Sequence, residues 1–321
     1  MQFKSFVAIL LASSAAATPI QPRQDPNPFA NITNALNQAN LTTLSTILTR
    51  YAGTQQGQQF ASALSNGNHT VFAPSNAALD PIVSTMGNDT SAIGPILDYH
   101  VANGSFPADL VAPARSHSIV NTLLTNDTFV NLGGSPQVQV LEQTPDGNGL
   151  VVRRTTGNAT VTNTTTYQNL IIHVVDTVLT PPGDLKAVLS SSLVGRAPGG
   201  FAGLGGSLQK VGQLENVNNA ASTTVFAPID DAFAAINTTV ANLTNDQLTS
   251  VLNNHIINGN VIYSPQLNST SNVQAASGAQ LNFTTRDGVP YVNYNQTSAR
   301  ILRSDVATKT GVVHVIDTVL A

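Results

Sequence analysis

Histidine side chains are the groups of this chain best suited to chemistry near neutral pH, because their charge changes there. Two of the six histidines are each followed by an aspartate three residues later: His173 by Asp176, and His314 by Asp317. A carboxylate that orients an imidazole would make a general base. Both pairs lie in short apolar runs typical of strands, where residues three apart point to opposite faces of the sheet. We therefore expect both pairs to be structural.

Two other histidines, His100 and His255, lie on the apolar faces of predicted helices. Each follows apolar residues at helical spacing, such as Ile93 and Ile96 before His100. A neutral imidazole there can donate to a backbone carbonyl and serve as an ordinary core group. A metal site would need histidines from separate segments to converge, and their spacing does not indicate this. We predict no catalytic residues, no metal and no cofactor.

One pair of motifs supports a different chemistry. Ser207 and Lys210 fit S-x-x-K, and residues 309–311 fit K-T-G, both of which occur in serine β-lactamases and penicillin-binding proteins. The S-D-N element that belongs between them is missing. The pair would also exist in only one of two repeated segments. A serine hydrolase that uses Ser207 and Lys210 therefore remains a remote alternative.

The composition excludes several classes of protein. The chain has 321 residues, 41% of them apolar and only 9% charged, with 13 basic and 17 acidic side chains and a formal net charge of -4. A nucleic-acid-binding protein would need a basic surface to neutralise phosphates. Because there is no cysteine, disulfides, thiolate nucleophiles, iron–sulfur clusters and cysteine zinc sites are all excluded.

The N-terminal residues indicate export. Lys4 precedes an apolar run at residues 6–12, and Ala15 and Ala17 provide a cleavage pattern before Thr18. We therefore predict a signal peptide at residues 1–17. The apolar run is shorter than the roughly 20 residues of a transmembrane helix, and we predict no transmembrane segment. The expected destination is the cell exterior or cell wall, with the vacuole as another possible endpoint.

Potential N-glycosylation sites recur along the chain and support the predicted export. Glycans at these sites would keep a weakly charged surface soluble. An N-x-[ST] acceptor is only a candidate until occupancy is measured. Asn282 also starts such a sequence, but Phe283 follows it within a predicted strand, and we leave it out. The predicted acceptors are Asn31, Asn40, Asn68, Asn88, Asn103, Asn126, Asn158, Asn163, Asn237, Asn242, Asn268 and Asn295.

The chain contains an internal repeat, which determines its domain organisation. The segment TVFAP at 70–74 returns at 224–228, His100 returns as His255, and IHVVDTVL at 172–179 returns as VHVIDTVL at 313–320. The order is the same in both halves. We predict an N-terminal extension at 18–34 and two copies of one domain, at 35–181 and 182–321, which join near the Pro181-Pro182-Gly183 turn.

Each copy mixes helices and strands. Leu44, Ile47, Leu48 and Tyr51 have the spacing of a helix packed on a core. The repeated TVFAP segment predicts a strand that stops at its proline, and Asn76 or Asp230 then caps the helix that follows. Each copy closes on a strand that is apolar on both faces and therefore central in its sheet. We expect the glycine-rich residues 196–206 to form a flexible excursion.

The repeated segments resemble the fasciclin (FAS1) domain family. Its hallmarks are a TVFAP segment followed by [ST]-[ND]-x-A-[FL], a Tyr-His motif, and a closing [VI]-H-V-[VI]-D-x-V-L segment. The resemblance implies an α+β fold with two FAS1 domains, each a β-sandwich wedge flanked by helices. The structural motif residues are Phe72, Pro74, Asn76, His173 and Asp176, and their counterparts Phe226, Pro228, Asp230, His314 and Asp317.

The resemblance also implies a function in adhesion. FAS1 domains usually lack enzymatic activity and act at the cell surface, cell wall or extracellular matrix, so we expect partners there and no nucleic acid. The Tyr-His motif, a candidate adhesion site, is intact as Tyr99-His100, whereas the second copy has Asn254-His255. The first domain should therefore carry more of any such binding. An extracellular carrier that holds an apolar ligand between helices and sheet is the alternative.

Overall fold

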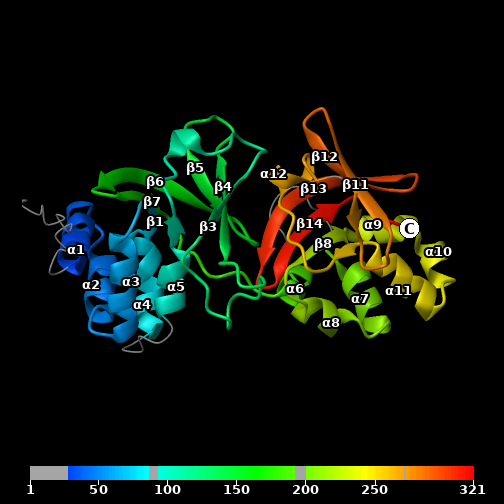
Figure 1. The fold of residues 1–321 in the computed structure, drawn as a ribbon, viewed down its shortest axis with the longest axis horizontal. Helices are drawn as coiled ribbons and strands as arrows, with labels where there is room; N and C mark the ends of the chain where they lie inside the picture. The colour runs from blue at the N-terminus through cyan, green and yellow to red at the C-terminus, as the bar shows by residue number, and fades with distance from the viewer. Residues whose placement is uncertain (1–27, 87–92, 192–199, 271) are drawn as a thin grey trace, which may run out of the picture.

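The computed structural model describes residues 28–86, 93–191, 200–270 and 272–321. The predicted signal peptide at 1–17 lies outside these residues. Within them the chain forms two successive units that lie side by side (Figure 1). None of the described helices has the length and apolar composition of a membrane-spanning segment.

The first unit begins with three helices and ends with a run of strands. Its helices are α1 (Pro28–Gln38), α2 (Thr42–Tyr51), α3 (Gln55–Ser65), α4 (Asn76–Met86), α5 (Ile93–Tyr99) and the short 3-10 helix Ala108–Leu110. Its strands are β1 (His69–Pro74), β2 (Val101–Asn103), β3 (Ser118–Asn121), β4 (Val138–Gln143), β5 (Leu150–Arg153), β6 (Asn158–Tyr167) and β7 (Leu170–Val175).

The second unit repeats this order. Its helices are α6 (Leu185–Leu189), α7 (Ala202–Lys210), α8 (Leu214–Asn219), α9 (Asp230–Ala235), α10 (Asn237–Ala241), α11 (Asn245–Asn253) and α12 (Ser264–Leu267). Its strands are β8 (Thr223–Pro228), β9 (Ile256–Ile257), β10 (Val273–Gln274), β11 (Gln280–Arg286), β12 (Val289–Tyr294), β13 (Thr297–Thr308) and β14 (Gly311–Ile316).

Each unit contains one sheet that nearly closes on itself. The strand orders are β2-β1-β7-β6-β5-β4-β3 and β10-β11-β12-β13-β14-β8-β9. The closing strand of each unit pairs in parallel with the TVFAP strand, and the other neighbours are antiparallel. The open edges approach each other, since Ala102 forms a bridge with Thr122 and Ala276 N donates to Ile256 O at 2.7 Å. Both units are thus sheet wedges flanked by helices.

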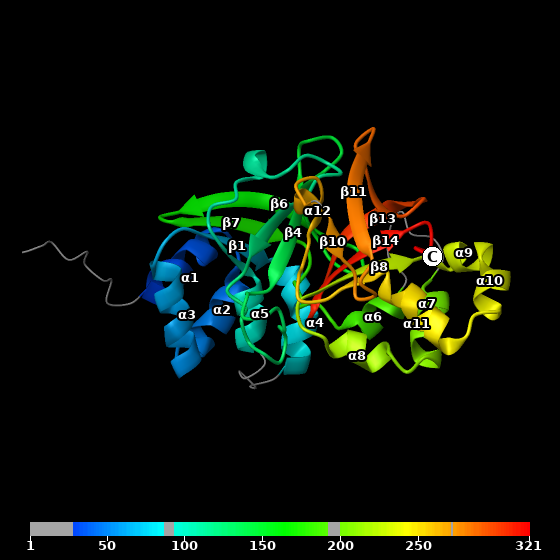
Figure 2. The same cartoon turned by 45° about the vertical axis from the view of Figure 1, so that its right-hand side comes forward.

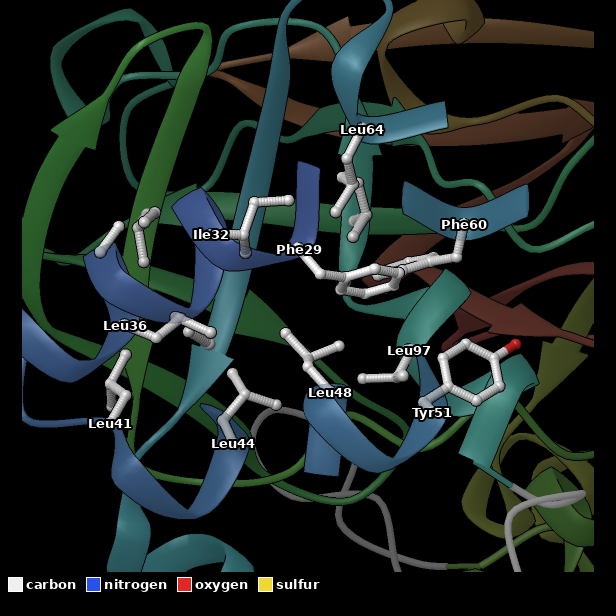
Figure 3. Close-up of a cluster of buried hydrophobic side chains, with 14 of the residues drawn as sticks. Phe29, Ile32, Leu36, Leu41, Leu44, Leu48, Tyr51, Phe60, Leu64 and Leu97 are labelled. Atoms are coloured by element: carbon white, nitrogen blue, oxygen red, sulfur yellow. The ribbon is translucent and has the colours of Figure 1, made fainter. Parts of the chain in front are cut away.

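Two apolar layers stabilise each unit. In the first, one layer lies between the helices and the sheet, and Figure 3 shows side chains of α1, α2, α3 and α5 converging there. Leu44, Leu48 and Tyr51 of α2 are buried in it, in agreement with the predicted helical stripe. The second layer fills the inside of the wedge and includes Phe72 and Leu141, both 0% exposed. The second unit has the same two layers.

The first unit starts earlier than its predicted boundary. Residue 35 lies inside α1, and Phe29 and Ile32 are each only 8% exposed in the helix-side core. The apolar face of α1 packs against α2 and α3. Part of the predicted extension at 18–34 therefore belongs to the domain.

The two predicted helix caps have different partners from those we expected. Asn76 Oδ1 accepts from Thr43 N at 3.0 Å, at the start of α2. Asp230 Oδ1 accepts from Gly203 N at 2.7 Å, at the start of α7, and it lies inside α9, whose N-cap is Ile229. Each side chain satisfies the unpaired N–H of a helix distant in sequence.

The glycine-rich segment is helical from Ala202 onward, so the expected flexible excursion is wrong for residues 202–206. Residues 196–199 lie outside the described part. A Cβ atom on Gly203 would lie 2.8 Å from Phe233 Cγ. Glycine is needed there so that α7 can pack closely against α9, and its flexibility is not used.

Candidate functional site

The histidines of the two Tyr-His positions are buried and hydrogen-bonded at both ring nitrogens. His100 Nδ1 lies 2.7 Å from Ile96 O, and Leu179 N donates to His100 Nε2 at 2.9 Å. His255 makes the equivalent bonds at 2.8 and 2.9 Å. Because a backbone N–H can only donate, each Nε2 is the acceptor and each Nδ1 carries the proton. Neither ring has a nitrogen available for a ligand.

Burial also makes these two rings poor bases. It lowers the pKa of His100 and of His255 to about 4, although the carbonyl bond to each ring opposes this. Both imidazoles are therefore neutral at pH 7. Each fastens a helix end to the segment just after the closing strand of its unit.

The two histidine–aspartate pairs are separated within their strands. His173 Nε2 donates to Phe106 O at 2.9 Å, and Thr164 Oγ1 donates to its Nδ1 at 2.8 Å. Asp176 Oδ1 instead accepts from Thr160 N at 2.8 Å. In the second unit His314 Nε2 donates to Ile262 O at 2.8 Å. The carboxylates therefore orient strand ends and do not orient imidazoles.

The other structural motif residues extend this repeated arrangement. Phe72 and Phe226 are fully buried, and their rings lie 5.4 and 5.5 Å from the imidazoles of His173 and His314. Asp317 Oδ1 accepts from Arg300 N at 2.8 Å. Pro74 and Pro228 end β1 and β8.

The residue before the shared histidine differs between the units. Tyr99 Oη donates to Val138 O at 3.2 Å, at the start of β4, and Gln139 Nε2 donates to Tyr99 O at 2.5 Å. Asn254 Nδ2 donates to Leu320 O at 2.9 Å instead. Tyr99 is 5% exposed and Asn254 is 6% exposed. Tyr99 thus reaches across the wedge, whereas Asn254 bonds to the end of its own unit.

The predicted glycosylation asparagines are exposed wherever the structure describes their side chains. The side chains of Asn31 and Asn237, and all of Asn88, lie outside the described part. Asn282, which we had left out, is also exposed, on β11. The exposed acceptors are Asn40, Asn68, Asn103, Asn126, Asn158, Asn163, Asn242, Asn268 and Asn295.

The residues of the hydrolase alternative lie on two separate elements. Ser207 and Lys210 belong to α7, and Lys309 lies in the turn between β13 and β14. The backbone of Lys309 bonds to Gly183 and to Asn131, so it holds the interdomain contact. Nor are three His, Asp or Glu side chains of the described ranges placed to hold a metal ion.

A polar cluster joins the two units and was not foreseen from the sequence. His117 Nδ1 donates to Asp305 Oδ2 at 2.6 Å, and His117 Nε2 lies 3.8 Å from Glu142 Oε2. Arg153 Nη1 lies 2.5 Å from the same Glu142 oxygen. Ser264 binds Asp305 through its N–H at 2.7 Å and through its hydroxyl. We call these five residues the interdomain cluster.

The electrostatics of this cluster favour charged carboxylates. Burial would raise the pKa of Asp305, but hydrogen bonds from His117 and Ser264 and the nearby imidazoles outweigh it and lower that pKa. Burial acts in the same direction on Glu142, and the Arg115 N–H together with Arg153 lowers its pKa overall. An ionised Asp305 accepts from the first unit through His117, so the two units meet across a buried, charge-assisted hydrogen bond.

A local irregularity turns Asp305 toward the first unit. The pairing of β13 with β14 shifts register between Arg303 and Val306, and Asp305 has a φ of 59°. Such bulges redirect side chains. Asp305 lies nine residues before His314, and its N–H donates to His314 Nδ1 at 3.4 Å. In the first unit Thr164 lies nine residues before His173 and donates to that ring through its hydroxyl. The difference between the two repeats at this position was the sequence signal that could have indicated a special role for Asp305.

Several further bonds cross between the units near the cluster. Gln137 Nε2 donates to Thr308 O at 3.1 Å, and Arg303 Nη2 donates to Arg154 O at 2.6 Å. The two views agree that α12, which begins at Ser264, lies at the centre of the molecule between β4 and β13 (Figures 1 and 2). The two units are therefore joined by several hydrogen bonds.

Known proteins resemble this chain in sequence. The chain is 29% identical over 261 residues to a fasciclin-like arabinogalactan protein of Arthroderma benhamiae. This alignment covers 79% of this chain and 58% of the relative. It is 24% identical over 259 residues to the fasciclin-like arabinogalactan protein CTB11 of Cercospora beticola, with 78% and 66% covered. The matches thus span less than two thirds of either relative.

A solved structure and a domain family also match. The FAS1 domain pair of the insect cell adhesion molecule Fasciclin I aligns with a TM-score of 0.41 and 17% identity, over 85% of this chain and 95% of that one. The model of the fasciclin domain matches residues 30–181 and again residues 199–321. These two segments cover most of the chain and coincide with its two repeated units, so the chain belongs to the fasciclin domain family, with two FAS1 domains.

Proposed function

We propose that this chain is a secreted, N-glycosylated, non-enzymatic protein that acts in cell adhesion or in contacts with the cell wall or extracellular matrix. The exposure of the described sequon asparagines on both domains carries the proposal. The names of the fungal relatives, which describe arabinogalactan proteins, support it. The engaged ring nitrogens of the shared histidines support a scaffold role for these residues.

The test of adhesion is a binding experiment with three surfaces. The native protein is incubated with isolated cell-wall polysaccharide, with matrix and with whole cells, beside a glycoprotein of similar size. We expect retention above the control on at least one surface. Equal retention of both proteins on all three surfaces would overturn the adhesion proposal. An enzymatically deglycosylated sample shows whether the polypeptide or its glycans make the contact.

Export and glycosylation are tested separately. The full chain is produced in a fungal host, and the medium and cell fractions are analysed by mass spectrometry before and after N-glycosidase treatment. We expect protein in the medium that begins at Thr18, with a mass that falls on treatment. Retention in the cytoplasm with an unmodified N-terminus would contradict both expectations.

Any contribution of the Tyr-His motif to adhesion would be indirect. Tyr99, His100 and His255 are buried, so a partner cannot touch them without local opening. Tyr99 instead supports the start of β4 through Val138. We infer that substitution of these residues changes binding only as far as it moves the surface above them.

A carrier of an apolar ligand is the second candidate, because the first domain has an apolar cavity. It measures about 60 Å³ and lies between the helices and the sheet, with Leu36, Leu44, Phe60 and Ile172 in its lining. An engineered cavity of about 150 Å³ holds one benzene molecule. A lipid chain would therefore require α1, α2 and α3 to move away from the sheet.

Native mass spectrometry tests the carrier function. A carrier purified without detergent should retain a co-purifying apolar molecule, and Leu44→Phe should reduce its occupancy by filling the cavity. A measured mass equal to that of the polypeptide and its glycans, with no bound molecule, would exclude the carrier function. The hydrolase alternative predicts that an acyl-serine probe labels the protein and that Ser207→Ala abolishes the label; an unlabelled wild type would exclude it.

A further inference from the structure

A polar groove of about 380 Å³ lies between the two FAS1 domains. The first domain contributes Asn121 at the end of β3 and the loop that includes Gly133 and Ser135. The second domain contributes Ser222 and the segment that includes Asn260 and Tyr263. Ligand-binding pockets usually measure about 300–1,000 Å³. The groove is therefore large enough for a small ligand or for a segment of a larger one.

The lining of the groove is polar but uncharged. None of the described residues that line it is acidic, basic or a histidine. Asn121 and Asn260 are exposed carboxamides, and Ser135 is an exposed hydroxyl. All three residues line the groove and are exposed, so their donors and acceptors are accessible to a ligand there. Carboxamides and hydroxyls both donate and accept, as the hydroxyl groups of a sugar do.

Hydrogen bonds between the domains hold the groove in shape. Asn131 N donates to Lys309 O at 2.7 Å, and Ser222 N donates to Asn131 O at 3.2 Å. Asn131 Nδ2 also donates to Asn219 O at 3.2 Å. Ligand binding to such a preformed site needs little ordering of the protein.

The backbone at the groove is also tightly fitted. Gly133 has a φ of 62°, and a Cβ atom on it would lie 2.9 Å from Ser222 Oγ. Ser222 itself has a φ of 54°, which a residue with a side chain adopts at an energetic cost. The domains thus meet in a strained, close contact directly at the lining.

We propose that the interdomain groove binds a short segment of an uncharged polysaccharide. The carboxamides and hydroxyls pair with sugar hydroxyls. A uronate or phosphate group would find no cationic side chain among the described lining residues, and an acyl chain would leave the carboxamides unpaired. The inference rests on the proposed role in wall or matrix contact and gives that role a specific site.

Two sources could supply such a segment. One is an external wall glycan, and the other is an N-glycan of the same protein, since the acceptor Asn126 precedes the groove loop by a few residues. Both present the same uncharged sugar chemistry. Samples with and without N-glycosidase treatment distinguish them, because removal of the chain's own glycan would empty the groove.

Calorimetric titration with defined hexasaccharides tests the proposal. The probes are laminarihexaose, chitohexaose and mannohexaose, with hexagalacturonate as the charged comparison. We expect the full-length, N-glycosidase-treated protein to bind at least one neutral probe and not hexagalacturonate. The double substitution Asn121→Leu with Asn260→Leu removes two neutral hydrogen bonds and should weaken that binding about tenfold. Asn216→Leu, an exposed asparagine on α8, is the matched control and should change nothing.

The outcomes separate this inference from the proposed function. Wall retention of the native protein without binding of any neutral hexasaccharide would overturn the groove site and leave adhesion intact. Equal affinity of the double variant and the wild type would also overturn it. If the double variant does not fold, a photoreactive chitohexaose on the wild type should label residues 131–138 and 259–263, and labelling confined to other segments would reject the site.

Discussion

The two FAS1 domains share the residues that build the fold and differ in the residues that face each other. His100 and His255 make the same pair of backbone bonds, and Asn76 and Asp230 both cap a distant helix. At the position nine residues before the strand histidine, however, Thr164 bonds locally, whereas Asp305 reaches His117 of the other domain. The two copies thus share a scaffold, and Asp305 differs from its counterpart by bonding to the other domain.

The largest effect is expected from the aromatic core, where the domains should behave alike. Phe72→Ala and Phe226→Ala each remove a fully buried ring and should lower the free energy of unfolding by about 3–5 kcal/mol. Denaturant unfolding measures the loss, and hydrogen exchange assigns it to one domain. Leu110→Ala is the control, because Leu110 is 76% exposed. A loss in only one of the two phenylalanine variants would break the equivalence of the scaffolds.

The next effect should separate the domains. Asp305→Thr installs the residue of the first domain and leaves His117 without its carboxylate, which should cost about 3 kcal/mol of stability. Small-angle scattering should show a more open domain pair, and hydrogen exchange should rise in β3 and β13. Thr164→Ala removes only a local bond and should leave the pair compact. An unchanged scattering profile for Asp305→Thr would show that the cluster does not hold the domains together.

The shared helix histidines should make the same pH-dependent contribution to stability in the two domains. The pKa of His100 and His255 is about 4 in the folded state, below the ordinary value of 6.5, so the unfolded chain binds protons first as the pH falls. The stability that each neutral imidazole contributes is therefore complete above pH 6.5 and is lost between pH 6.5 and pH 4. The loss at pH 5 is about 2 kcal/mol per histidine.

Urea unfolding at pH 7 and pH 5 measures this dependence. In His100→Gln and in His255→Gln the difference between the two pH values should shrink by about 2 kcal/mol. His173 and His314, whose pKa values burial also lowers, add to the remaining dependence, and Asp98, whose pKa burial raises to about 6, opposes it. The same pH difference in the wild type and in either variant would show that the substituted imidazole is not buried and neutral.

The smallest effect concerns the Tyr-His position and should differ in place between the domains. Tyr99→Phe removes the donor to Val138 O, and Asn254→Ala removes the donor to Leu320 O. Each should cost about 1 kcal/mol. Faster amide exchange is expected at the start of β4 for Tyr99→Phe and near Leu320 for Asn254→Ala. The same exchange pattern in both variants would contradict the different roles assigned to these side chains.

Much of the fold could be predicted from the sequence, because its signals are local or repeated. The apolar stripe of α2 and the strand that stops at Pro74 follow from patterns a few residues long. The repeat then extended each local prediction to the second domain and, through the family resemblance, to the whole fold. Burial of His100 also followed from its place on an apolar helix face.

The unpredicted features depend on contacts between distant segments. Asn76 has the chemistry of a cap, but the helix that it caps begins at Thr42, and only the tertiary fold brings the two together. Gly203 lies in a glycine-rich segment, whose composition is typical of a flexible loop. Glycine is needed there because the Phe233 ring of another helix leaves no room for a Cβ atom. His117 and Asp305 carry no local signal, since 188 positions separate them.

The parallel pairing at the centre of each sheet has a consequence for biosynthesis. Phe72 of β1 pairs with His173 of β7, and Phe226 of β8 pairs with His314 of β14, so each sheet needs segments from both ends of its domain. Such long-range pairing is slow, because the intervening chain must first lose its freedom. On the ribosome the first domain can close while the second is still being translated. The buried bond between His117 and Asp305 is then among the last contacts to form.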